Sequence, residues 1–139
     1  MEVMFVAPRD GFMKAGDSVA AGMADITVKA AYGSVVEDEG FLFIGFAEGE
    51  EEEEGYVLFR QPVGGGPVWF EVNDEAFGAE DAVAGVTVGP KGFEVALRPE
   101  LAVAFGFATS VAVKIGPGCE DATPALEALR EMLGEVWPG

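Results

Sequence analysis

Residues 55–74 read GYVLFRQPVGGGPVWFEVND, and this stretch decides the fold that we predict for the chain. Two runs rich in tyrosine, valine, phenylalanine and tryptophan flank a segment between Pro62 and Pro67 that holds three consecutive glycines. Residues of the first kind suit a pleated, half-buried surface, whereas glycine and proline let the chain reverse direction. We therefore predict a β-hairpin whose turn contains the glycines.

The second run of this hairpin alternates between apolar and mostly polar positions. Val68, Phe70 and Val72 fall on one side, and Trp69, Glu71 and Asn73 fall on the other. Successive side chains of a strand point to opposite faces, so this pattern predicts an antiparallel sheet with one face on a core.

The same patterns predict the remaining elements outward from the hairpin. Further strands are expected at residues 26–31, 41–46, 86–88, 93–98 and 110–115, and helices at 99–106 and 124–136. We expect the nearly apolar run 41–46 to be buried on both sides and residues 76–82 to form a loop. Together these segments predict an α+β fold: an antiparallel sheet of about six strands, a short helix between the last two strands, and a C-terminal helix packed on one face.

The predicted C-terminal helix carries an amphipathic pattern. Thr123 is suited to cap it and Pro124 to open it. The apolar stripe contains Leu126, Leu129, Met132, Leu133, Val136 and Trp137, and the charged residues Glu127, Arg130, Glu131 and Glu135 lie off it. Because the apolar residues recur at helical spacing, we expect the stripe to pack on the sheet.

The length and the cysteine content predict one cytoplasmic domain formed by residues 1–139. A chain of 139 residues is large enough to bury roughly two-thirds of its unfolded surface, and half of its residues are hydrophobic. Residues 1–25 are expected to form either an edge strand or a loosely ordered arm. Cys119 is the single cysteine, which excludes an internal disulfide. The apolar run 3–7 is too short for a signal peptide, and no segment is long enough to cross a bilayer.

The chain is strongly acidic. It contains 25 aspartate and glutamate residues against 8 lysine and arginine residues, which gives a formal net charge of −17. Such a surface repels nucleic acids and anionic membranes, so we predict that the protein binds neither. The charge favours a cationic partner, but it also fits a solubility device or an acid-rich proteome such as that of a halophile.

Residues suited to catalysis are scarce. The sequence contains no histidine, which removes the commonest general base and metal ligand and excludes Ser-His and Cys-His nucleophiles. Cys119 is followed by Glu120 and Asp121, whose charges raise the pKa of a thiol. Ser110 and Lys114 are separated by four strand residues, roughly 13 Å, and do not form a pair. We predict no catalytic residue, no cofactor and no metal site.

Two segments are candidates for binding a partner. The first is the glutamate run at residues 50–54, whose like charges predict a solvated loop. The second is the polar side of the hairpin. The candidate residues are Glu50, Glu51, Glu52, Glu53, Glu54, Trp69, Glu71, Asn73 and Asp74. Trp69 is either an exposed aromatic anchor within an acidic rim or part of a second core that the N-terminal arm covers.

Several of these landmarks resemble a known family in their order. They are GYVLFRQ at 55–61, VWFEVNDE at 68–75, the small residues Ala82 and Ala84 before Gly85 and Val86, and FEVAL at 93–97. The segment 101–106, the strand 111–115 and the final helix complete the series. From about Phe41 to Trp137 the chain is similar to immunity protein family ten, which is found beside toxins in bacterial polymorphic toxin systems.

This resemblance implies a cytoplasmic, non-catalytic protein that binds and neutralises a cognate toxin. Many such toxins are nucleases with basic clefts, to which an acidic inhibitor is steered electrostatically. The resemblance brings no contact residues with it, so the candidate residues rest on charge and exposure. Two other hypotheses remain: an unrelated acidic binding or scaffold domain without catalysis, and an enzyme that uses carboxylates.

Overall fold

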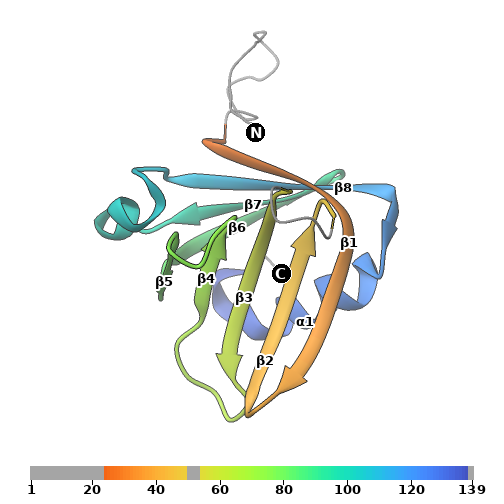
Figure 1. The fold of residues 1–139 in the computed structure, drawn as a ribbon, viewed down its shortest axis with the longest axis horizontal. Helices are drawn as coiled ribbons and strands as arrows, with labels where there is room; N and C mark the ends of the chain where they lie inside the picture. The colour runs from red at the N-terminus through yellow and green to blue at the C-terminus, as the bar shows by residue number, and fades with distance from the viewer. Residues whose placement is uncertain (1–23, 50–53, 138–139) are drawn as a thin grey trace, which may run out of the picture.

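The computed structural model describes residues 24–49 and 54–137, which form an α+β fold as predicted (Figure 1). The strands are β1 Ile26–Asp38, β2 Phe41–Ala47, β3 Tyr56–Pro62, β4 Trp69–Val72, β5 Gly78–Glu80, β6 Val83–Gly89, β7 Gly92–Leu97 and β8 Ser110–Glu120. The helices are the 3-10 helix η4 Pro99–Phe105, the α-helix α1 Ala122–Leu133 and the 3-10 helix η5 Gly134–Val136. Most of the predicted N-terminal arm and most of the glutamate run lie outside the described residues.

The eight strands of the described chain form one mixed sheet, so the prediction of about six antiparallel strands was too low in number and missed one parallel pair. The strand order is β5-β4-β3-β2-β1-β8-β7-β6, and β1 and β8 run parallel whereas the other neighbours run antiparallel. One missed strand, β5, has three residues within the predicted loop 76–82, which is too short for alternation to be visible. Both β1 and β8 alternate between buried and more exposed positions along the part where they pair, so their patterns did not reveal that these two strands run parallel.

The long strand β1 joins the two halves of the sheet. Its first part pairs with β8, from Ile26 opposite Val111 to Ala30 opposite Ile115, and its second part pairs with β2. The register shifts between Ala30 and Tyr32, and a bulge of this kind bends a strand. The sheet therefore curls into a half-barrel, in which β2–β5 form one wall and β8, β7 and β6 the other (Figure 1).

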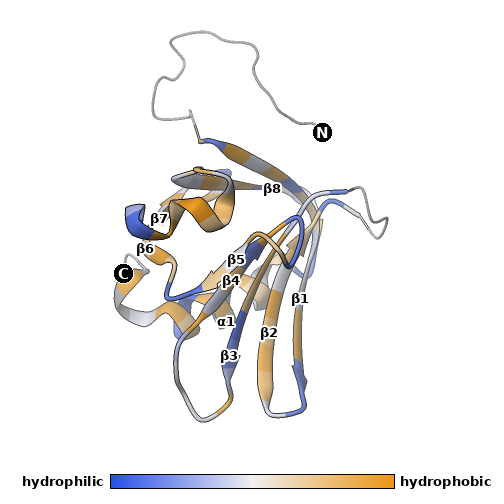
Figure 2. Ribbon diagram, turned by 60° about the vertical axis from the view of Figure 1, so that its left-hand side comes forward, coloured by the Kyte–Doolittle hydropathy of each residue, from blue (hydrophilic) through white to orange (hydrophobic). Residues whose placement is uncertain are grey.

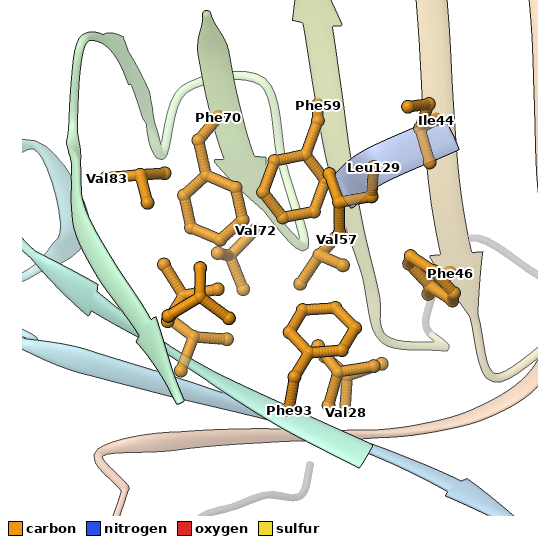
Figure 3. Packing of buried hydrophobic residues seen from close by; sticks show 14 of the residues in the cluster. Val28, Ile44, Phe46, Val57, Phe59, Phe70, Val72, Val83, Phe93 and Leu129 are labelled. Carbon is orange, nitrogen blue, oxygen red and sulfur yellow. The ribbon is translucent and has the colours of Figure 1, made fainter. Parts of the chain in front are cut away.

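The hydrophobic core fills the inside of this half-barrel (Figure 3). Phe46 from one wall and Phe93 from the other meet edge to face, with ring centroids 5.3 Å apart. The two buried rings of the hairpin, Phe59 and Phe70, are 4.8 Å apart, which confirms that the side of the hairpin carrying Phe70 faces the core. Burying each such side chain contributes about 1.5–3 kcal/mol, so the aromatic residues join the two walls firmly.

Helix α1 packs on the inner face, as the apolar stripe predicted. Leu129 is fully buried and Leu133 nearly so, whereas Glu127 is exposed. The predicted cap was wrong: the N-cap residue is Asp121, and it makes no side-chain capping hydrogen bond. The helix also ends at Leu133, earlier than predicted, because Gly134 adopts a positive φ of 51°. The chain continues as η5, and Val136 and Trp137 still pack against the core.

Candidate protein-binding site

The side chains that point away from the core on β1–β5 form a surface that we call the outer face. One row of residues crosses all five strands, because the cross-strand register aligns one residue from each strand. In order from β1 to β5, the row contains Val36, Phe43, Arg60, Trp69 and Glu80. Side chains directly opposite each other in a sheet are in contact range, so these residues form one continuous surface.

This surface corrects the prediction that residues 41–46 are buried on both sides. Ile44 and Phe46 are fully buried, but Phe41 is 36% exposed, and Phe43 is only partly covered. An antiparallel pair on each side of β2 leaves one sheet face uncovered, because the single α-helix lies on the other face. Figure 2 shows β2 as an apolar band that ends at the hydrophilic turn between β1 and β2.

Arg60 lies between two aromatic rings at the centre of the outer face. Its guanidinium carbon is 5.4 Å from the ring centroid of Phe41 and 5.1 Å from that of Trp69. Both distances are within the range of cation–π attraction. The ring of Phe43, whose residue pairs with Arg60 across the strands, is 6.3 Å from that of Phe41, so three aromatic rings gather around this part of the outer face.

Trp69 is held in place by its neighbours. Its environment is intermediate between the two that we predicted, an exposed aromatic anchor and a buried residue of a second core. Its indole Nε1 donates a hydrogen bond of 2.6 Å to Oε1 of Glu71. The indole ring also covers Gly78 of β5, where a Cβ atom would lie only 2.5 Å from Cζ2 of Trp69. The side chain is half-buried against these partners and still contributes to the surface. Its orientation is therefore fixed before any partner binds.

Glu71 is buried and does not belong to an exposed rim, contrary to what alternation had indicated. It is 7% exposed, and its second oxygen, Oε2, accepts a hydrogen bond of 2.5 Å from the hydroxyl group of Tyr56. Burial, this hydrogen bond and nearby negative charges raise the pKa of Tyr56 far above its ordinary value, so Tyr56 stays a donor. The buried carboxylate of Glu71 thus fixes the orientation of the Trp69 indole through the hydrogen bond from Nε1.

Asn73 and Asp74 stabilise the end of β4 and the turn after it. The amide oxygen Oδ1 of Asn73 accepts a hydrogen bond of 2.9 Å from the backbone N–H of Tyr56. The carboxylate of Asp74 accepts one of 2.8 Å from the backbone N–H of Ala76. Both residues are exposed, so they border the outer face while they hold the turn.

Residues 50–53 of the glutamate run fall outside the described part of the chain. The described Glu48, just before the run, lies with Asn73 around Gly55 at one end of the sheet. Glu54 is described and half-buried. Glu48 anchors the connection, because its carboxylate accepts hydrogen bonds from the backbone N–H groups of Gly55, at 3.1 Å, and Lys29, at 2.9 Å. These hydrogen bonds connect the end of β2 and the start of β3 to β1, just before its register shift.

A cluster of exposed apolar residues, which the sequence did not reveal, lies at the opposite end of the same strands. We call it the distal end: Val36, Phe41 and Val63, between 36% and 54% exposed. Val35 is also exposed, but it pairs with the buried Ile44 and therefore lies on the other face of the sheet. A hydrogen bond of 2.9 Å from the backbone N–H of Val63 to the carbonyl of Gly40 holds the β3–β4 connection against the β1–β2 turn. The unbroken apolar run 41–46 was the available signal, had it been interpreted as one exposed face.

The rim of the outer face is acidic. Asp38 pairs with Phe41 at the distal end, and Glu80 pairs with Trp69 on β5. Glu37 and Glu39 flank Asp38, and all three are exposed. An aromatic centre with an arginine and a charged rim is the composition typical of a protein interface.

Cys119, the single cysteine, lies away from the outer face, near the end of β8. Burial and the charge of Glu120 raise the pKa of its thiol, in the direction that the sequence predicted. Among residues 24–49 and 54–137, no three acidic or cysteine side chains gather as metal ligands. No helix in the same ranges is long and apolar enough to span a membrane.

Comparisons of the chain with protein-family models, with curated proteins and with solved structures returned no match. The resemblance to immunity protein family ten therefore stays a prediction that these comparisons do not test. The class that the fold and the site define is a small α+β domain with an aromatic, acid-rimmed sheet face.

Proposed function

We propose that this protein is an immunity protein that binds and neutralises a cognate bacterial toxin by covering a basic surface of it. One observation carries the proposal: an aromatic face centred on the half-buried Arg60 and Trp69 lies within a rim of exposed acidic residues. Aromatic residues and arginine contribute most of the binding energy in protein interfaces, and the rim mainly governs steering and specificity.

The charge of the chain indicates which kind of partner fits this face. With a net charge of −17, the protein repels nucleic acids, anionic membranes and its own copies. A protein with a basic surface is attracted instead, and its association is accelerated at low salt. A nuclease toxin has such a surface where it binds its substrate, so an acidic inhibitor is suited to occlude that cleft.

The pre-organised geometry of the face supports occlusion as the mechanism. Trp69 is fixed by Glu71 and Gly78, and Arg60 is held between two rings. Because these side chains lose little conformational freedom on binding, most of their contact energy is available for affinity. Occlusion of this kind needs no catalytic group in the inhibitor.

The test is co-expression of this chain with the toxin domain encoded by the neighbouring gene. We expect the chain to restore growth and to co-purify with the toxin. A matched pair of variants locates the effect: Phe41→Ala should weaken protection, whereas Phe107→Ala, the same change at a phenylalanine that is 76% exposed elsewhere, should not. Growth arrest without any co-purification would contradict the proposal and favour the alternative, an unrelated acidic binding or scaffold domain.

A further inference from the structure

Arg60 is the cation at the centre of the outer face, and within residues 24–49 and 54–137 its contacts are aromatic rings and not a carboxylate. We infer that the partner supplies one: it places an aspartate, a glutamate or its terminal carboxylate on Arg60, inside an otherwise basic contact surface. This inference rests on the proposed use of the outer face, and it names the chemistry that the centre of that face recognises.

The carboxylates near Arg60 are engaged elsewhere or lie at the rim. Both oxygens of Glu71 already accept hydrogen bonds, one from Trp69 and one from Tyr56. Glu80 faces Trp69 across the strands, and Asp38 faces Phe41. None of the carboxylates in the described ranges forms an ion pair with Arg60, although acidic residues outnumber basic ones threefold in the chain.

The two rings leave the guanidinium group suited to bind an anion. A guanidinium is planar, and its five N–H donors lie in the plane, where they match the two oxygens of a carboxylate. The rings of Phe41 and Trp69, at 5.4 and 5.1 Å, restrict the motion of the group and shield it from water. An arginine held in this way loses less entropy when it forms a bidentate pair.

The charge of the chain distinguishes a protein carboxylate from other anions. A free small anion or a nucleic acid phosphate must approach a surface with a net charge of −17, which repels it. A carboxylate on a basic protein does not meet this barrier, because the lysine and arginine residues around it are attracted to the acidic rim. A second copy of the chain is equally acidic and is repelled like the free anions.

The experiment uses two synthetic peptides, Lys-Lys-Gly-Glu-Gly-Lys-Lys and its Gln counterpart, both with amidated C-termini. Binding to the full chain is followed by NMR through the Arg60 Nε–H and Trp69 Nε1–H signals. We expect the Glu peptide to bind about threefold more tightly than the Gln peptide, the size typical of a partly exposed ion pair. Equal affinity of the two peptides would overturn the inference.

Three variants identify the group responsible. In Arg60→Gln the preference for the Glu peptide should disappear, whereas in Lys114→Gln, which removes the same charge from an exposed site on β8, it should remain. Arg60→Lys keeps the charge but loses the planar fork, so the preference should fall below that of the wild type. A preference that survives Arg60→Gln, or is unchanged in Arg60→Lys, contradicts the inference. Because the toxin is absent from this experiment, its result is independent of whether the chain protects against the toxin.

Discussion

Gly33 of β1 lies directly against Ala125 of α1: a Cβ atom at position 33 would be 2.9 Å from the Cβ of Ala125 and 3.1 Å from the carbonyl oxygen of Asp121. The absence of a side chain at Gly33 therefore lets the first turn of the helix approach the sheet. This contact fixes the position of the first turn of α1 against the sheet.

The contact predicts that Gly33→Ala is destabilising, because the helix or the strand has to shift. Overpacking of this kind typically costs about 1–3 kcal/mol, which urea unfolding monitored by circular dichroism will measure. Gly85→Ala is the matched control, since a Cβ at Gly85 meets no atom within 4 Å and its φ is not positive. Equal midpoints for the two variants would mean that α1 does not pack against Gly33.

The burial of the α1 stripe predicts a large effect of Leu129→Asp. This change places a charge without a partner at a fully buried position, so it should lower the free energy of unfolding by at least about 3 kcal/mol. Glu127→Gln, at an exposed position on the same helix, should be nearly neutral. Thermal unfolding of both variants tests this prediction. Similar melting temperatures for the two variants would mean that Leu129 does not lie on the buried side of α1.

Glu94 on β7 predicts a pH-dependent stability. Burial, and secondarily the charge of Asp25, raise the pKa of Glu94 above its usual value of 4.5. The folded state therefore holds the proton of Glu94 more tightly than the unfolded state, so ionised Glu94 is unfavourable above its folded pKa and costs nothing below about 4.5. Glu94→Gln should raise the melting temperature slightly at pH 7, and this gain should vanish by about pH 4.

The same charge change at an exposed site provides the control for Glu94. Glu127→Gln should show no comparable gain at either pH. If Glu94→Gln lowered stability at pH 7, or if its gain grew on acidification, the environment assigned to Glu94 would be wrong.

The sequence allowed much of the wall around the hairpin to be predicted. The alternation of Phe70 and Val72 with Trp69 predicted which side faces the core, and the spacing of Leu129 and Leu133 predicted the buried side of the helix. These predictions succeed because burial imposes a period on the sequence. The parallel pairing of β1 with β8 could not be predicted in this way, because it joins segments far apart in the chain and no local pattern specifies which strands become neighbours.

The candidate site was predicted only in part, for a related reason. Trp69 belongs to the outer face, but alternation alone did not indicate that the carboxylate of Glu71 is buried under it. Phe41 was assigned to a doubly buried strand, since an apolar run looks the same whether its second face is covered or exposed. Arg60 was not singled out, because its stacking depends on residues from two neighbouring strands.

The glutamate run predicts an effect on association alone. Replacing Glu50, Glu51, Glu52 and Glu53 with Gln removes charges that act at long range and are screened within about 8 Å at physiological salt. Association with the toxin should slow and lose part of its salt dependence, while dissociation should hardly change. Glu127→Gln with Glu131→Gln, on the exposed side of α1, controls for general charge. Stopped-flow kinetics at several salt concentrations will reveal a changed dissociation rate if the run makes close contacts instead.

The most direct test of the proposed interface is the dissociation rate of the toxin complex formed by Trp69→Ala, compared with that of Phe107→Ala. Thermal unfolding must first show that both variants are folded, because Trp69 also covers Gly78. If the outer face binds the toxin, losing the indole should cost roughly 2 kcal/mol and speed dissociation at least about tenfold, with Phe107→Ala near the wild type. A folded Trp69→Ala variant that dissociates at the wild-type rate would contradict the account.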